Sequence, residues 1–200
     1  MNRIIFFLIL IFILNPIQCL LAQNNKLFWS QKRALSVTDF KALIKNDNSY
    51  ENALASVGIS YSVTFDNSKA DIVIKTFFRT DLSWFDKSIQ SDWLLQHEQG
   101  HFDIAEIFAR KLKKEMSNIL LPKNNDCNKV VTDMYDKYFN EMKKMQELYD
   151  KETDHSRNRN EQLRWLKKID RLLQQYSYYS TENLDKHKLH TSSNRKQIIQ

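Results

Sequence analysis

The centre of the chain reads Trp93-Leu-Leu-Gln-His97-Glu98-Gln-Gly-His101-Phe-Asp-Ile-Ala-Glu-Ile-Phe108. On an α-helix, the spacing of His97 and His101 places the two imidazoles about 40° apart on one face. Two imidazoles in this arrangement can bind one tetrahedral metal ion. Glu98 lies about 100° round the helix from His97, where its carboxylate can contact a metal-bound water without binding the metal itself.

The rest of this helix face is apolar. At about 100° per residue, the following large apolar side chains fall within about 60° of His97: Trp93, Leu94, Ile104, Phe108 and Leu112. Asp103 and Glu106 fall on the opposite side, so neither is expected to be a metal ligand. An amphipathic helix can carry such a motif by chance. Two histidines beside a glutamate on a buried face nevertheless favour Zn²⁺ bound by His97 and His101, with Glu98 as the catalytic base.

Gly100 lies inside the same motif, and it is one of only two glycines in the chain. A glycine in a helix interior costs about 1 kcal/mol relative to alanine. Gly100 falls at the edge of the buried face, so we expect a strand or the backbone of a substrate to pass close to it. The alternative is a tolerated cost without a role.

Residues 94–106, together with Ser83-Trp84 before them, resemble a bacterial family of predicted secreted zinc-dependent proteases, formally a domain of unknown function. Two flanking blocks also resemble this family: Trp29 with Leu35 and residues 39–41, and residues 149–155 followed by Gln162 and Trp165. The resemblance spans roughly residues 28–175 and implies a peptidase that acts on a peptide or protein substrate. Where the family pattern has a glycine after the late histidine, this chain has Ser156, so the local turn is expected to differ.

A catalytic zinc usually takes three protein ligands and leaves one position open for water. The late block of the family resemblance contains Asp150, Glu152, Asp154 and His155, and the third ligand is expected there. We predict His155, because a neutral imidazole suits zinc. Glu152 and Asp150 remain alternatives, either as the ligand or as a hydrogen-bond partner that orients one. The block can also be a capped junction between two helices, with Asp154 as the N-cap.

Residues 1–22 are predicted to be a signal peptide. Arg3 is followed by an unbroken apolar run over residues 4–14, and Leu20-Leu21-Ala22 is a suitable cleavage site. The run is short for a transmembrane helix, although retention as an anchor is the alternative. We therefore predict a secreted or periplasmic protein that has no stable membrane insertion after cleavage. Cys127 would then be its only cysteine, which excludes an intramolecular disulfide.

The net charge is +6, and the basic residues are interleaved with acidic ones along the chain. This pattern is typical of solvated helix faces, so no nucleic-acid partner is predicted. The length suits one domain, assigned to residues 23–176 as a zincin-like metallopeptidase domain. Residues 177–200 are polar and are predicted to form a disordered tail.

The hydrophobic pattern predicts an α+β, zincin-like fold. Leu27–Trp29 is a short strand, and alternation over Ile59–Phe65 with a more apolar run over Asp71–Phe78 predicts an antiparallel hairpin whose second strand is central. A helix is expected to begin at Ser36, with Phe40, Leu43 and Ile44 as its apolar face.

Two further helices are predicted after the motif helix. Apolar residues recur at steps of three and four in two later segments: Val131, Met134, Tyr138, Met142, Met145 and Tyr149, and then Leu163, Leu166, Ile169 and Leu173. The fold is therefore a small antiparallel sheet followed by three helices. In zinc peptidases of this plan, an edge strand pairs with the substrate backbone, and either hairpin strand or Ser83-Trp84 could supply it.

The favoured function is hydrolysis of peptide bonds by a metal-activated water, with Glu98 as general base. One alternative is a metal-binding protein on the same fold that does no chemistry. Another is a cell-envelope interaction protein that uses its basic surface and needs neither histidine. The glutamate favours the enzyme, because a purely structural metal site needs no base and usually has no open position.

Overall fold

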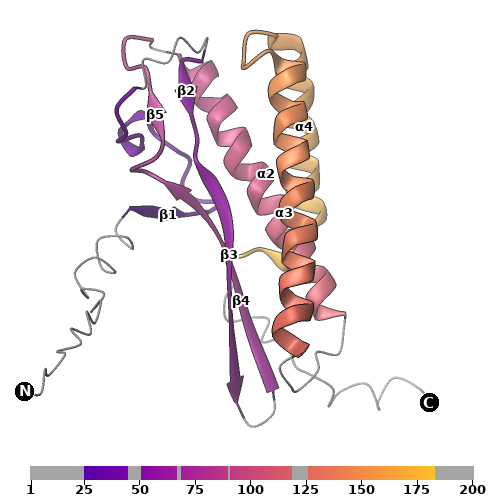
Figure 1. Ribbon diagram of the computed structural model, residues 1–200. Helices are drawn as coiled ribbons and strands as arrows, with labels where there is room; N and C mark the ends of the chain where they lie inside the picture. Colours follow the sequence, from indigo (N-terminus) through magenta and orange to yellow (C-terminus); the bar gives the residue numbers. More distant parts are fainter. Residues whose placement is uncertain (1–24, 45–50, 67–68, 90, 119–125, 183–200) are drawn as a thin grey trace, which may run out of the picture.

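The computed structural model describes residues 25–44, 51–66, 69–89, 91–118 and 126–182 (Figure 1). The predicted signal peptide and the chain beyond residue 182 lie outside the described residues. The elements are β1 (Lys26–Phe28), η1 (Val37–Asp39), β2 (Ala53–Leu54), β3 (Val57–Asp66), β4 (Lys69–Arg79), β5 (Trp84–Phe85), α2 (Asp92–Ser117), α3 (Asp126–Thr153), α4 (Arg159–Gln175) and η2 (Ser177–Tyr179). The predicted α+β class, with a small antiparallel sheet before the motif helix and two helices after it, is confirmed.

The main sheet has the strand order β1-β4-β3, and both pairs are antiparallel. β4 is central, as the apolar run predicted. Strand alternation turns Ile59 of β3 and Ile74 of β4 toward α2, where both are buried. A second, two-stranded sheet pairs β2 with β5.

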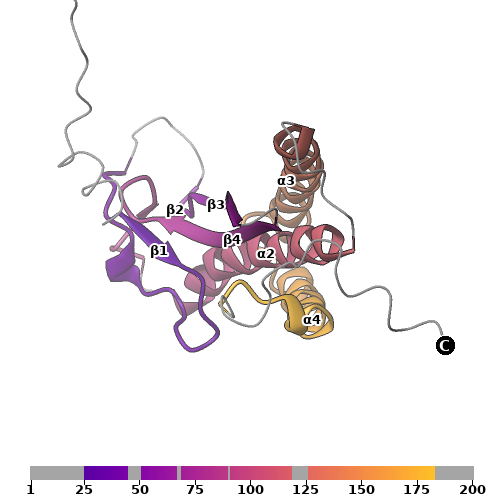
Figure 2. The ribbon, with the colours of Figure 1, turned by 90° about the horizontal axis from the view of Figure 1, so that it is seen from below.

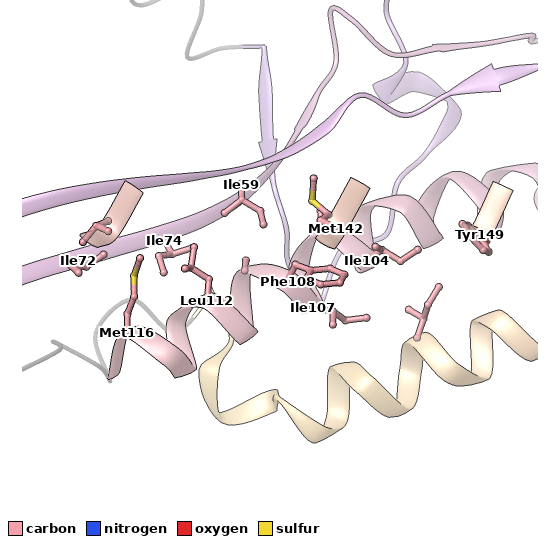
Figure 3. Close-up of a cluster of buried hydrophobic side chains, with 14 of the residues drawn as sticks. Ile59, Ile72, Ile74, Ile104, Ile107, Phe108, Leu112, Met116, Met142 and Tyr149 are labelled. Carbon is pink, nitrogen blue, oxygen red and sulfur yellow. The ribbon is translucent and has the colours of Figure 1, made fainter. Parts of the chain in front are cut away.

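The motif helix α2 forms the middle layer, with the sheet on one side and α3 and α4 on the other (Figures 1 and 2). Figure 3 shows the buried side chains that join these layers: Ile59, Ile72, Ile74, Ile104, Ile107, Phe108, Leu112, Met116, Met142 and Tyr149. Each fully buried side chain of this size contributes about 1.5–3 kcal/mol. None of the described helices is both long and apolar enough to span a membrane.

The helix predicted from Ser36 is only the single 3-10 turn η1. The capping box is present, since Ser36 N donates to Asp39 Oδ2 over 2.9 Å. The chain then leaves the helical path, because the backbone N–H groups of Lys41 and Ala42 donate to Thr80 O and Ser83 O. Phe40 is buried, but Leu43 of the predicted apolar face is 90% exposed.

The predicted apolar face of α4 is also partly wrong. Leu163 is 48% exposed, and the buried positions are Gln162, Trp165 and Ile169. Gln162 is buried because its Nε2 donates to Trp93 O at the start of α2, over 2.9 Å. A polar residue therefore occupies a core position, which the pattern of apolar residues does not predict.

Candidate metal centre

The motif helix α2 begins at Asp92, directly after its N-cap. Ser91 is the N-cap, and its side chain accepts a hydrogen bond of 3.1 Å from Leu94 N. The first turns of α2 then place His97, Glu98 and His101 against neighbouring elements, and all three side chains are buried. The two imidazoles lie near-perpendicular, with ring centroids 4.9 Å apart.

Asp150 of α3 completes the group. Its Oδ1 lies 3.1 Å from His97 Nε2 and 2.9 Å from His101 Nε2. The ligand atoms of these three residues all lie within 4.8 Å of one another, so the group could hold a metal ion. In a tetrahedral zinc site with bonds of about 2.0–2.1 Å, neighbouring ligand atoms are about 3.3–3.4 Å apart. The two histidine–carboxylate distances are close to this spacing, so the group is compatible with a bound metal ion.

The electrostatics of this group favour an ionised carboxylate. Burial alone would raise the pKa of Asp150, but the hydrogen bonds from His101 and His97 hold it well below its ordinary value. Burial likewise opposes the charged form of His101, and the hydrogen bond and charge of Asp150 nevertheless raise its pKa. The pKa of His97 is lowered, chiefly by burial. Asp150 is thus charged at neutral pH and His97 favours the neutral form, and both are the states that bind a metal.

Glu98 lies in the same cavity as these residues. Burial raises its pKa to about 7, although the charge of His101 and a hydrogen bond from Ala55 N–H act in the opposite direction. A carboxyl group whose pKa lies near neutrality is suited to both taking and giving a proton.

His155, the predicted third ligand, lies outside this group. Its Nδ1 is 4.0 Å from Asp150 Oδ1 and 3.9 Å from Glu51 Oε1, and its side chain is 41% exposed at the rim of the cavity. His155 lies outside the group because α3 continues to Thr153, so that His155 falls in the turn after the helix. Asp150 stays on the helix and faces α2. In this arrangement Asp150, and not His155, lies beside the two histidines.

The turn after α3 is strained. Asp154, His155 and Ser156 all have positive φ, at 48°, 49° and 76°, a conformation that costs about 1–2 kcal/mol per residue without glycine. Trp93 Nε1 of α2 donates to Ser156 O over 2.9 Å and ties this turn to the motif helix. Ser156 takes the left-handed conformation that the expected glycine would take. Asn158, and not Asp154, is the N-cap of α4.

The other acidic candidates have structural partners. Glu152 accepts a hydrogen bond of 2.7 Å from Trp165 Nε1, which joins α3 to α4. Asp103 accepts from Trp29 Nε1 over 2.8 Å, as expected for a residue that faces away from the histidines. None of these contacts points to a third ligand other than Asp150.

Glu106 is fully buried and connects α2 to two other parts of the chain. It accepts hydrogen bonds from Thr76 of β4, from Thr181 and from Arg110, whose Nε lies 2.8 Å from Glu106 Oε1. Lys113 Nζ donates to Ser180 O over 2.9 Å. The contacts of the domain thus continue to Glu182, beyond the boundary that the sequence placed at residue 176.

A cavity of about 170 Å³ opens beside the metal group. Residues 51–55 line it together with His155 and Gln146. The strand beside the site is therefore β2, which pairs with β5. Within the described ranges, neither strand of the β3-β4 hairpin lines the cavity, and Ser83-Trp84 does not line it either. Sequence reasoning missed β2 because two residues are too few to show alternation.

The described residues thus form an α+β domain in which two buried histidines and the half-buried Asp150 lie beside a buried glutamate. The chain belongs to a family described as bacterial protein of unknown function (DUF922), whose model matches residues 34–156, more than half of the chain. The match includes every residue of the metal group. Comparisons with curated proteins and with solved structures found no significant match.

Proposed function

We propose that the protein is a zinc-dependent peptidase in which His97, His101 and Asp150 hold the metal and Glu98 is the general base. The single observation that supports it most is the placement of Glu98 in one cavity with all three candidate ligands. Two imidazoles and a carboxylate leave one zinc position open, which is the pattern of catalytic and not structural sites.

The chemistry follows from these side chains. Zinc bound there would lower the pKa of a bound water to about 7 and polarise the scissile carbonyl. The Glu98 carboxylate takes the proton of the attacking water and later gives it to the nitrogen of the departing amine. Burial of Glu98 favours this transfer, because little of the carboxyl group is exposed to solvent.

Among the described residues, β2 pairs only with β5, so its other edge supplies a place for the substrate backbone. Asp86 N donates to Asn52 O over 2.8 Å, and β2 pairs with β5 through Ala53↔Phe85 and Leu54↔Trp84. Because backbone groups alternate along a strand, the N–H and C=O of Ala53 face away from β5, toward the cavity. An extended peptide can pair with Ala53 and pass over the metal group.

We further propose that the protein acts outside the cytoplasm, in the periplasm or after secretion. The support is the apolar run after Arg3 and the small-residue site at Ala22. The substrate expected there is a peptide or a protein segment in an extended conformation, which can pair with the edge of β2.

The experiment combines metal analysis with a digestion assay. The purified protein is expected to hold about one zinc per chain and to cleave members of a library of unstructured peptides, detected by mass spectrometry. Glu98→Gln is the matched control, since glutamine keeps the shape but cannot take the proton, so it should retain zinc and cleave nothing. Zinc binding without cleavage by the wild type would favour the non-catalytic metal-binding alternative. Absence of zinc would reject the site.

A further inference from the structure

We infer that Gly100 and Tyr149 form a contact that positions Asp150 against the two histidines, so that the glycine inside the motif is required for tight metal binding. The inference rests on the proposed metal site and concerns its assembly, not its hydrolytic activity. Tyr149 immediately precedes Asp150 on α3 and is fully buried. Its position therefore determines where the Asp150 carboxylate lies.

Tyr149 packs closely against the motif helix. Its ring stacks on the His97 imidazole, with centroids 4.5 Å apart and an interplanar angle of 21°, and meets His101 edge-on at 5.2 Å. Its hydroxyl donates to His97 O over 3.4 Å. One aromatic ring thus contacts both histidines of the group.

This stacking has a specific role for His97. Its Nδ1 is buried and has no hydrogen-bond partner in the part of the chain that the structure describes. When Nε2 binds a metal, no hydrogen bond from the protein is left to orient the ring, although metal-binding histidines usually have one. The flat contact with Tyr149 takes over this function.

The contact is possible only because residue 100 has no side chain. A Cβ on Gly100 would lie 2.5 Å from the Tyr149 hydroxyl oxygen, 2.9 Å from Cζ and 3.0 Å from Cε1, whereas ordinary contacts begin at 3.4 Å. The neighbour expected at this glycine was a strand or the substrate backbone. The structure has the ring of Tyr149 there instead.

Tyr149 cannot move aside freely. Its ring packs on Trp165 at 5.3 Å, and the Trp165 indole is itself held by its hydrogen bond to Glu152. Restoring ordinary contact would require a shift of about 1 Å, from 2.5 Å to 3.4 Å at the hydroxyl oxygen. An alanine at position 100 must therefore push this part of α3, with Asp150, away from the histidines.

The test measures zinc affinity by chelator competition and thermal unfolding of the metal-free full chain, for the wild type and four variants. Gly100→Ala should bind zinc at least about tenfold more weakly. Tyr149→Phe keeps the stacked ring and loses one long hydrogen bond, so it should weaken zinc binding less than Gly100→Ala does. The double variant should recover part of the affinity, because the atom closest to the new Cβ is gone.

Met142→Ala is the matched control, since it removes a buried side chain of α3 that belongs to the core and not to the metal group. It should lower the melting temperature without weakening zinc binding. If Gly100→Ala does not fold, the effect of adding Tyr149→Phe is measured as recovery of folding in the double variant.

The inference is overturned if Gly100→Ala binds zinc like wild type, if its loss is no greater than that of Met142→Ala, or if Tyr149→Phe rescues neither folding nor affinity. A protein that shows the expected zinc affinities but cleaves no peptide would retain this inference and lose the proposed peptidase function.

Discussion

Replacing Asp150 and His155 separately decides which residue completes the metal site. Asp150→Asn keeps the size of the side chain and removes the charge, while His155→Ala removes the imidazole at the rim. Asp136→Asn on the exposed face of α3 is the matched control for the loss of one carboxylate. All three variants leave the motif helix intact.

The geometry gives the expected magnitudes. Asp150 Oδ1 lies 2.9 Å and 3.1 Å from the two histidine nitrogens, whereas His155 Nδ1 lies 4.0 Å from the same oxygen. Removing a group that only supports a ligand typically weakens metal binding 10–100-fold. Asp150→Asn should therefore cost at least about 100-fold in zinc affinity, or about 2.7 kcal/mol, and His155→Ala less than about tenfold.

The assay is competition with a chromophoric chelator at pH 7 and constant ionic strength, with thermal unfolding in EDTA to show that each variant folds. Asp136→Asn should bind zinc as the wild type does. If His155→Ala loses more affinity than Asp150→Asn, the imidazole is the ligand and the turn after α3 rearranges on binding. If neither variant loses affinity, the site is completed by another residue.

Other perturbations test the surroundings of the site. In metal-free protein, the difference in unfolding free energy between wild type and Asp150→Asn should be largest between pH 3.8 and 6.5, the ordinary pKa values of aspartate and histidine. This difference should shrink at lower pH because the Asp150 carboxylate is protonated, and at higher pH because His101 loses its proton. If urea titrations show the same difference at every pH, Asp150 and His101 do not form an ion pair. Glu106→Gln should destabilise the fold by about 3–5 kcal/mol because Arg110 remains buried beside a neutral amide, and a loss below about 1 kcal/mol would argue against a buried ion pair. A chain that stops after residue 176 should melt at a lower temperature than one that stops after residue 182, because it lacks the Thr181 donors to Glu106; equal melting temperatures would contradict this contact.

Local patterns in the sequence predicted most of the fold. Alternation over Ile59–Phe65 and the apolar run over Asp71–Phe78 are direct consequences of a sheet with one buried face, and the structure has β3 and β4 there. The helical stripe from Val131 to Tyr149 likewise follows from burial of one side of α3. Such signals are short-range, so they can be identified without knowing the partners.

The completion of the site could not be predicted in this way. The choice between Asp150 and His155 depends on where α3 ends, and helix ends are poorly determined by apolar periodicity. The preference of zinc for imidazole favoured His155, but geometry and not donor chemistry decides which group reaches the histidines. Gly100 indicated a close approach, although its partner Tyr149 is distant in the sequence.

Long-range pairing accounts for the other differences. β2 has only two residues, and its place beside the cavity comes from pairing with β5. Glu106 resembles an ordinary charged residue on a solvated helix face, yet it is buried because Arg110 and Thr181 reach it. The turn at Ser36 does not continue as a helix, because the N–H groups of the residues that follow it donate to the carbonyl groups of Thr80 and Ser83.

Zinc K-edge X-ray absorption of the zinc-loaded wild type tests the central claim most directly, because it reports the number of imidazoles bound to the ion. The proposed site predicts two imidazoles from His97 and His101, with the remaining ligands being oxygen atoms at about 2.0–2.2 Å from Asp150 and water. A spectrum that requires three imidazoles or a thiolate sulfur would contradict the His97-His101-Asp150 site.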